Sequence, residues 1–144
     1  MSFKKAIENT PLLKNAFEKG LKALGSNSSK VKPLDPSKCE GSVDIDTAVK
    51  SIYPNASRWD YAVGYNGKTY FIEVHTAKTD EVKSVLKKLQ WLKDFLINDA
   101  PELNKEPKSF HWIASNANHI LPGSLQVRQL TLKGIKPVKE LTLY

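Results

Sequence analysis

The sequence has little cysteine and no long apolar run. The single cysteine, Cys39, excludes an intramolecular disulfide and a cysteine-based zinc site and is expected to be an ordinary free thiol. No apolar run approaches the ~20 residues that a transmembrane helix requires, and the first residues carry lysines without a continuous apolar segment. We therefore predict no signal peptide, no membrane partner and a cytoplasmic location. Phosphate-binding loops, zinc boxes and nucleophile elbows are also missing.

The composition indicates one basic globular domain spanning residues 1–144. A chain of this length can bury a sizeable core, and its net charge is +7. Residues 1–38 carry eight lysines against three acidic residues, whereas residues 39–79 carry four basic against five acidic ones. Basic charge around a weakly acidic centre favours nucleic acid as a partner, because lysines neutralise phosphates. Surface charge that only aids solubility accounts for the same distribution equally well.

Residues 58–76, RWDYAVGYNGKTYFIEVHT, have the pattern of a β-hairpin. Two runs of aromatic and β-branched residues flank Asn66-Gly67, a strong signal for a two-residue turn. Such a turn fixes the register and pairs Asp60 with Glu73 across the two strands. We therefore expect two carboxylates to face each other.

The same register predicts a polar cluster at the end of the hairpin that lies away from the turn. It places Arg58, Asp60, Glu73 and His75 on one face. Facing carboxylates destabilise a sheet unless a cation, a shared proton or counter-charges such as Arg58 and His75 offset them. This cluster is therefore the first place to look for function.

The remaining elements predict an α/β fold with a mixed sheet flanked by helices. A buried strand after a long helix completes a βαβ unit, so this strand should run parallel to residues 68–76. The expected helices cover residues 3–24 (with a break near Pro11), 42–52, 79–97 and 124–133, and Gly134 ends the last of them. The expected strands are residues 109–115 and an edge strand at residues 137–143.

An Asp on one strand, Glu-x-His on the next, then a helix and a strand, resembles the PD-(D/E)XK nuclease superfamily, which has the restriction-endonuclease-like fold. The resemblance covers residues 58–115, with Asp60 and Glu73 matching the two acids. His75 stands where the family has lysine. The first of the family's three antiparallel strands is also not evident between residues 26 and 55.

The resemblance implies a metal-dependent nuclease that cuts phosphodiester bonds of DNA or RNA. Asp60 and Glu73 would hold Mg²⁺ or Mn²⁺, and His75 would assist the attacking water. Lys88, or Lys78, would supply the ammonium that is missing from its usual place. The nucleic acid itself would contact Arg58 and Lys78. By analogy, a homodimer would serve a double-stranded substrate, and a single-stranded substrate is the alternative.

The same residues are open to three alternative interpretations. The cluster can be a structural patch in which Arg58 pairs with Asp60 and His75 bonds Glu73. The fold can also serve as a catalytically inactive module that binds nucleic acid or protein, or as a domain unrelated to nucleic acid. We expect His111 and His119 to be ordinary polar residues.

Overall fold

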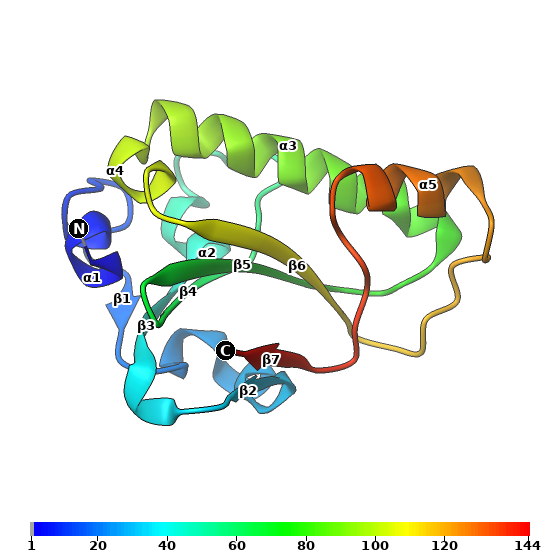
Figure 1. The fold of residues 1–144 in the computed structure, drawn as a ribbon. Helices are drawn as coiled ribbons and strands as arrows, with labels where there is room; N and C mark the ends of the chain where they lie inside the picture. Colours follow the sequence, from blue (N-terminus) through cyan, green and yellow to red (C-terminus); the bar gives the residue numbers. More distant parts are fainter. Residues whose placement is uncertain (1) are drawn as a thin grey trace.

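The computed structural model describes residues 2–144 and contains two sheets (Figure 1). The larger one has the strand order β1 (Phe17–Glu18), β3 (Cys39–Asp44), β4 (Tyr61–Tyr65), β5 (Lys68–His75) and β6 (Lys108–Ala114). The smaller one pairs β2 (Val31–Pro33) with β7 (Leu141–Leu143) in parallel. The expected α/β fold with a mixed sheet in a single domain is therefore confirmed.

Helices and helical turns surround these sheets. The α-helices are α1 (Phe3–Glu8), α2 (Ile45–Val49), α3 (Val82–Asn98), α4 (Pro101–Asn104) and α5 (Leu125–Leu132), and the 3₁₀ segments are η1 (Lys22–Lys30), η2 (Pro36–Lys38) and η3 (Thr79–Glu81). Figure 1 shows α3 lying across one face of the large sheet, with α4 and α5 in the same layer, and β2, β7 and η1 on the other side of that sheet.

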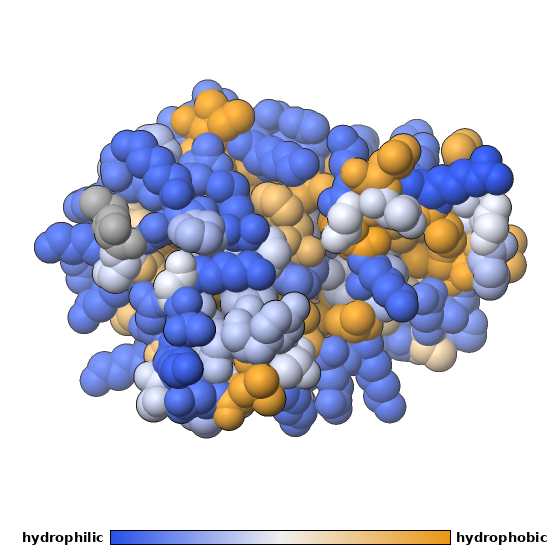
Figure 2. All heavy atoms as spheres, in the orientation of Figure 1, coloured by the Kyte–Doolittle hydropathy of each residue, from blue (hydrophilic) through white to orange (hydrophobic). Residues whose placement is uncertain are grey.

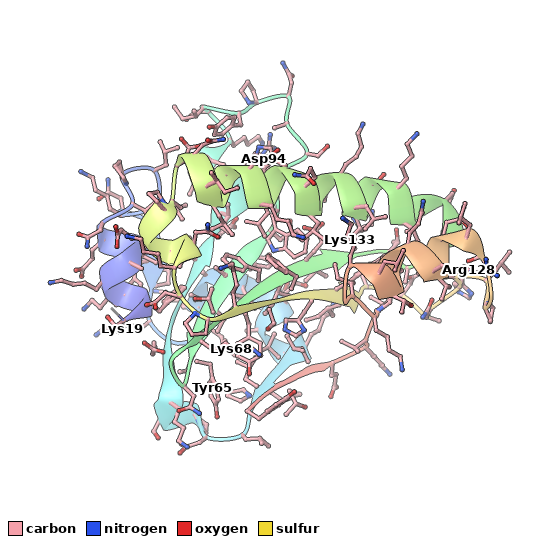
Figure 3. The ribbon with its side chains drawn as sticks, turned by 45° about the horizontal axis from the view of Figure 1, so that its top comes forward. Lys19, Tyr65, Lys68, Asp94, Arg128 and Lys133 are labelled. Carbon is pink, nitrogen blue, oxygen red and sulfur yellow. The ribbon has the colours of Figure 1, made fainter. Side chains whose placement is uncertain are left out.

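The hairpin has the predicted register. Tyr65 pairs with Lys68 and Tyr61 with Ile72, so Asp60 lies one residue before the first ladder pair. Asn66 and Gly67 both have positive φ, 48° and 77°, as a type I′ turn requires. Figure 3 shows Tyr65 and Lys68 at this turn end, away from Arg128 on α5 and from Lys133, which follows that helix. The candidate acids therefore lie at the other end of the hairpin.

The βαβ unit is also as predicted. The amphipathic helix α3 buries a stripe of apolar side chains against the sheet, and β6 follows parallel to β5. The helix expected at residues 124–133 is α5, which is capped by Ser124 and followed by Gly134 with a φ of 70°.

The helix predicted over residues 42–52 is confirmed only over α2, Ile45–Val49. Residues 39–44 form β3, where Ser42 and Val43 are fully buried and pair with β4. The helix begins only at Ile45, because Asp44 accepts a hydrogen bond from the Thr47 N–H and caps it. β3, β4 and β5 are thus three consecutive antiparallel strands.

Two terminal predictions are also corrected. The helix expected over residues 3–24 ends at Glu8, and β1 and η1 follow the turn around Pro11. Of the strand expected at residues 137–143, only Val138 lies along the edge of the first sheet, where it forms an isolated parallel bridge with Ile113 of β6. The regular strand is β7, which pairs with β2 in the second sheet. Near α5 the surface is apolar (Figure 2), since Leu121, Leu125 and Leu132 are exposed.

Candidate functional site

Asp60 and Glu73 hold each other in place across the hairpin. The Asp60 N–H donates to Glu73 Oε1 at 3.1 Å, and the Val74 N–H donates to Asp60 Oδ2 at 3.0 Å. Each carboxylate therefore accepts a main-chain hydrogen bond from the segment that carries the other one. This reciprocal arrangement fixes both groups at the end of the ladder.

A lysine from α3 completes the cluster. Lys88 Nζ lies 2.6 Å from Glu73 Oε2, and α3 brings it there by crossing the face of the sheet on which Glu73 stands. The Glu73 side chain is 0% exposed and the Lys88 side chain 23%. The motif of the sequence thus lacks a lysine two residues after Glu73, but an ammonium group reaches the same carboxylate from the helix.

Burial dominates the electrostatics of this cluster. Burial, together with the neighbouring Asp60, raises the pKa of Glu73 to about 8, and Lys88 partly opposes this shift. Burial also raises the pKa of Asp60. Burial disfavours the Lys88 ammonium, but the carboxylates of Glu73 and Asp60 outweigh it and raise the pKa of Lys88. Lys88 therefore stays charged at neutral pH beside a carboxyl group that takes up a proton easily.

His75 lies beside the cluster without a close bond to Glu73. Its Nδ1 is 3.7 Å from Glu73 Oε2, whereas its Nε2 lies 2.9 Å from Glu81 Oε2. The expectation that His75 bonds Glu73 is thus corrected: Glu81 is its hydrogen-bonding partner. Sequence reasoning missed this role of Glu81, because an acid in the first turn of a helix is already explained by the helix dipole.

Arg58 does not pair with Asp60. Its Nε donates to Asp46 Oδ1 at 2.6 Å, its Nη1 donates to the Tyr53 carbonyl at 2.7 Å, and its side chain is only 14% exposed. The ladder ends at Tyr61, so Arg58 lies in the loop before β4 and its guanidinium group holds that loop to α2. This engagement leaves little of Arg58 to contact a nucleic acid.

The other candidates lie outside the cluster. Lys78 is exposed, and its main chain forms a bridge with that of His119. His111 stacks on Tyr70 and bonds Ser109, and burial lowers its pKa to about 4, so it is neutral at physiological pH. The structure therefore brings together Asp60, Glu73, Lys88 and His75, but not His111 or His119.

Within residues 2–144, no three His, Cys, Asp or Glu side chains are grouped so that they could hold a metal ion. None of the helices in this range has the length and apolar character that crossing a membrane requires. Comparison of the chain with models of protein families, with curated proteins and with solved structures gives no match.

Proposed function

We propose that the protein is a metal-dependent nuclease of the PD-(D/E)XK type, acting on phosphodiester bonds of DNA or RNA. The observation that carries this proposal is the 2.6 Å contact between Lys88 Nζ and Glu73 Oε2, next to Asp60. This contact supports a role for Lys88: from α3 it would provide the ammonium group of the family's motif lysine, whose position is occupied here by His75. The three antiparallel strands that precede α3 are further support, because that family has such strands before its crossover helix.

The donor set is suited to Mg²⁺ or Mn²⁺. Mg²⁺ in phosphoryl-transfer sites is commonly held by one or two carboxylates together with waters and substrate phosphates, so two acids are sufficient. Asp60 and Glu73 supply these carboxylates, and a cation would also offset the repulsion between them. When bound, such a cation supplies Lewis-acid stabilisation of the phosphate.

The chain's own groups have separate roles in this proposal. The Lys88 ammonium stabilises negative charge that develops on the phosphate oxygens. The His75 imidazole accepts a proton from the attacking water, and Glu81 orients the ring through Nε2. The main-chain bonds between Asp60 and the β5 strand keep the two carboxylates in register during the reaction.

One observation favours the alternative of a catalytically inactive module that binds nucleic acid or protein. Both oxygens of Glu73 already have protein donors, namely the Asp60 N–H and Lys88 Nζ. A carboxylate satisfied in this way is stable without a metal ion. The inactive module and the nuclease therefore differ in whether a divalent cation competes with Lys88 for Glu73.

Calorimetric titration of Mn²⁺ and Mg²⁺ tests this difference, run alongside cleavage of single-stranded and duplex DNA and RNA. We expect wild type to bind the cation and cleave, and Asp60→Asn/Glu73→Gln to do neither. The control Glu8→Gln/Asp94→Asn removes the same charge from two positions outside the cluster and should behave as wild type. Absence of metal binding at millimolar concentration in wild type would refute the catalytic function and leave the binding module.

The proposal extends to location and assembly. We propose that the protein acts in the cytoplasm, and as a homodimer if its substrate is double-stranded. Light scattering should then give twice the chain mass of 16.1 kDa, and a monomer would favour single-stranded substrates.

A further inference from the structure

A cavity of about 550 Å³ lies at the end of the large sheet where β5 and β6 finish. Its walls come from the loop after β6, from the segment before β7 and from η1. The residues that matter for its chemistry are Lys30, Asn116, Asn118, Pro137, Val138 and Lys139. None of these residues belongs to the cluster around Glu73, so the cavity is a second feature of the surface.

Two asparagines line this cavity, and their side-chain oxygens are both engaged. The Ala77 N–H donates to Asn116 Oδ1 at 2.8 Å, and the Ile120 N–H donates to Asn118 Oδ1 at 3.0 Å. Because main-chain donors engage the oxygens, the orientation of both amides is settled and each Nδ2 is left as a donor. Neither Nδ2 atom donates a hydrogen bond within residues 2–144.

The charges at the cavity favour an anion. Of its two lysines, Lys30 is half-buried and Lys139 is exposed, and the only acid among the lining residues of the described chain is the exposed Glu140. Ammonium and amide N–H groups are donors to phosphate oxygens. Pro137 and Val138 form an apolar wall beside these donors, which suits a sugar or the face of a base.

We propose that this cavity binds a phosphate-bearing nucleotide unit of a single-stranded nucleic acid. A volume of about 550 Å³ lies within the range of small-ligand pockets. A duplex would offer mainly phosphates to this wall, whereas an unpaired nucleotide also offers its sugar and base face.

This inference rests on the proposed function, because the cavity adjoins the candidate site. Ala114, a lining residue, is the ladder partner of His75, and the N–H of the next residue, Ser115, donates to the His75 carbonyl at 3.1 Å. Because η1 and β7 lie on the side of the sheet opposite α3, a single strand that reaches both features must pass around the ends of β5 and β6. The cavity would hold one nucleotide while another phosphodiester of the same strand lies at Asp60 and Glu73.

Fluorescence anisotropy of a labelled 12-nucleotide single strand, with EDTA present to prevent cleavage, tests the cavity. Lys30→Gln/Lys139→Gln removes both cations, and Asn118→Asp keeps the acceptor for Ile120 while replacing the amino donor by an anionic oxygen. The matched control Lys14→Gln/Lys19→Gln loses the same charge from positions near the N-terminus; Figure 3 labels Lys19. Thermal melting of all variants confirms that they are folded.

We expect Lys30→Gln/Lys139→Gln to weaken binding at least about tenfold and to lower the slope of log K against log salt by about 1.4, since each phosphate contact on a single strand contributes about 0.7. Asn118→Asp should also weaken binding, and the control should not. Equal affinity of the cavity variants and the control would overturn the inference, as would tighter binding of a hairpin duplex than of the single strand.

Two further measurements separate the outcomes. Competition with AMP and with inorganic phosphate shows whether the cavity prefers a nucleotide within a strand or a free ligand. Displacement of the labelled oligonucleotide by micromolar AMP would assign the cavity to mononucleotides and overturn the strand proposal. Hydrolysis of bis-(p-nitrophenyl) phosphate with Mn²⁺ tests the proposed function without a strand. If wild type hydrolyses this diester but binds no oligonucleotide, the cavity inference fails while the proposed function stands. Hydrolysis that is lost in Asp60→Asn/Glu73→Gln but kept in the cavity variants would identify the catalytic site.

Discussion

Replacement of Lys88 by methionine should make the stability of the protein more sensitive to alkaline pH. In wild type the pKa of Glu73 is raised from 4.5 to about 8, so the native state holds a proton there that the unfolded chain has lost. Stability from this group is therefore complete below about pH 4.5 and is lost as pH rises through 8. Lys88 lowers the pKa of Glu73, so in Lys88→Met this pKa must lie above 8. The stability that Glu73 contributes must then continue to fall to higher pH than in wild type.

The size of the effect follows from the linkage relation. At about pH 6 Glu73 is protonated in both proteins, and Lys88→Met costs only the hydrogen bond, about 1 kcal/mol. Above the wild-type pKa the mutant continues to lose about 1.4 kcal/mol per pH unit relative to wild type. The difference in unfolding free energy should therefore grow by up to about 2 kcal/mol between pH 8 and about pH 9.5.

Urea denaturation followed by tryptophan fluorescence measures this difference at each pH. Trp59 and Trp112 are fully buried, so their emission should report unfolding. The control is Lys87→Met, which removes the neighbouring lysine of the same helix and should give a constant difference from wild type. A Lys88→Met difference that stays flat from pH 6 to about pH 9.5 would refute the electrostatic coupling between Lys88 and Glu73.

Two further substitutions probe the elements that position the site. Gly64→Ala should destabilise the protein by about 1–3 kcal/mol, because the added Cβ would lie 2.3 Å from Phe3 Cγ. In urea denaturation, additive effects of Gly64→Ala and Phe3→Ala in the double variant would show that the two side chains do not clash. Arg58→Lys should cost about 1–2 kcal/mol, because a lysine cannot bond Asp46 and the Tyr53 carbonyl together, and unchanged protease sensitivity of the loop before β4 would count against that role.

The hairpin could be predicted because its signal is local. Asn66-Gly67 admits the positive φ values of the turn, and the turn then fixes every pair up to Tyr61. The failure at Arg58 came from extending this ladder too far. The Asp60 carbonyl accepts a hydrogen bond from the Ile45 N–H at 2.8 Å, so the main chain there is bonded to the start of α2.

The strand β3 was missed because its sequence signals conflict. Asp44 both ends the strand and caps α2, so the helical spacing of Ile45 and Val49 predicts a helix that starts too early, at Ser42. A register shift between Cys39 and Gly41 also interrupts the regular alternation of a strand. Tertiary pairing with β4, which no local pattern records, decides the strand.

Lys88 lies within the helix that the sequence predicts over residues 79–97, but no sequence pattern gives its distance from Glu73. That distance depends on how α3 crosses the sheet, which is set by the whole apolar stripe of the helix. His75 illustrates the same limit, because its partner Glu81 lies six residues away across a turn between two elements. Sequence therefore predicted which side chains lie near the hairpin end, and packing determined which of them bond.

The double variant Glu73→Gln/Lys88→Met separates a structural role of the buried contact between Glu73 and Lys88 from a catalytic one. Removing one partner of a buried pair leaves an uncompensated group, but replacing both by neutral side chains of similar volume is often close to neutral for stability. The amide oxygen introduced by Glu73→Gln would still accept the Asp60 N–H, so the hairpin end should remain closed. We expect the unfolding free energy at neutral pH to stay within about 1–2 kcal/mol of wild type, whereas the loss of a metal ligand and of the ammonium should lower cleavage at least about a hundredfold. A double variant that is stable and still cleaves would show that the pair serves the fold alone and that any chemistry of this protein lies elsewhere.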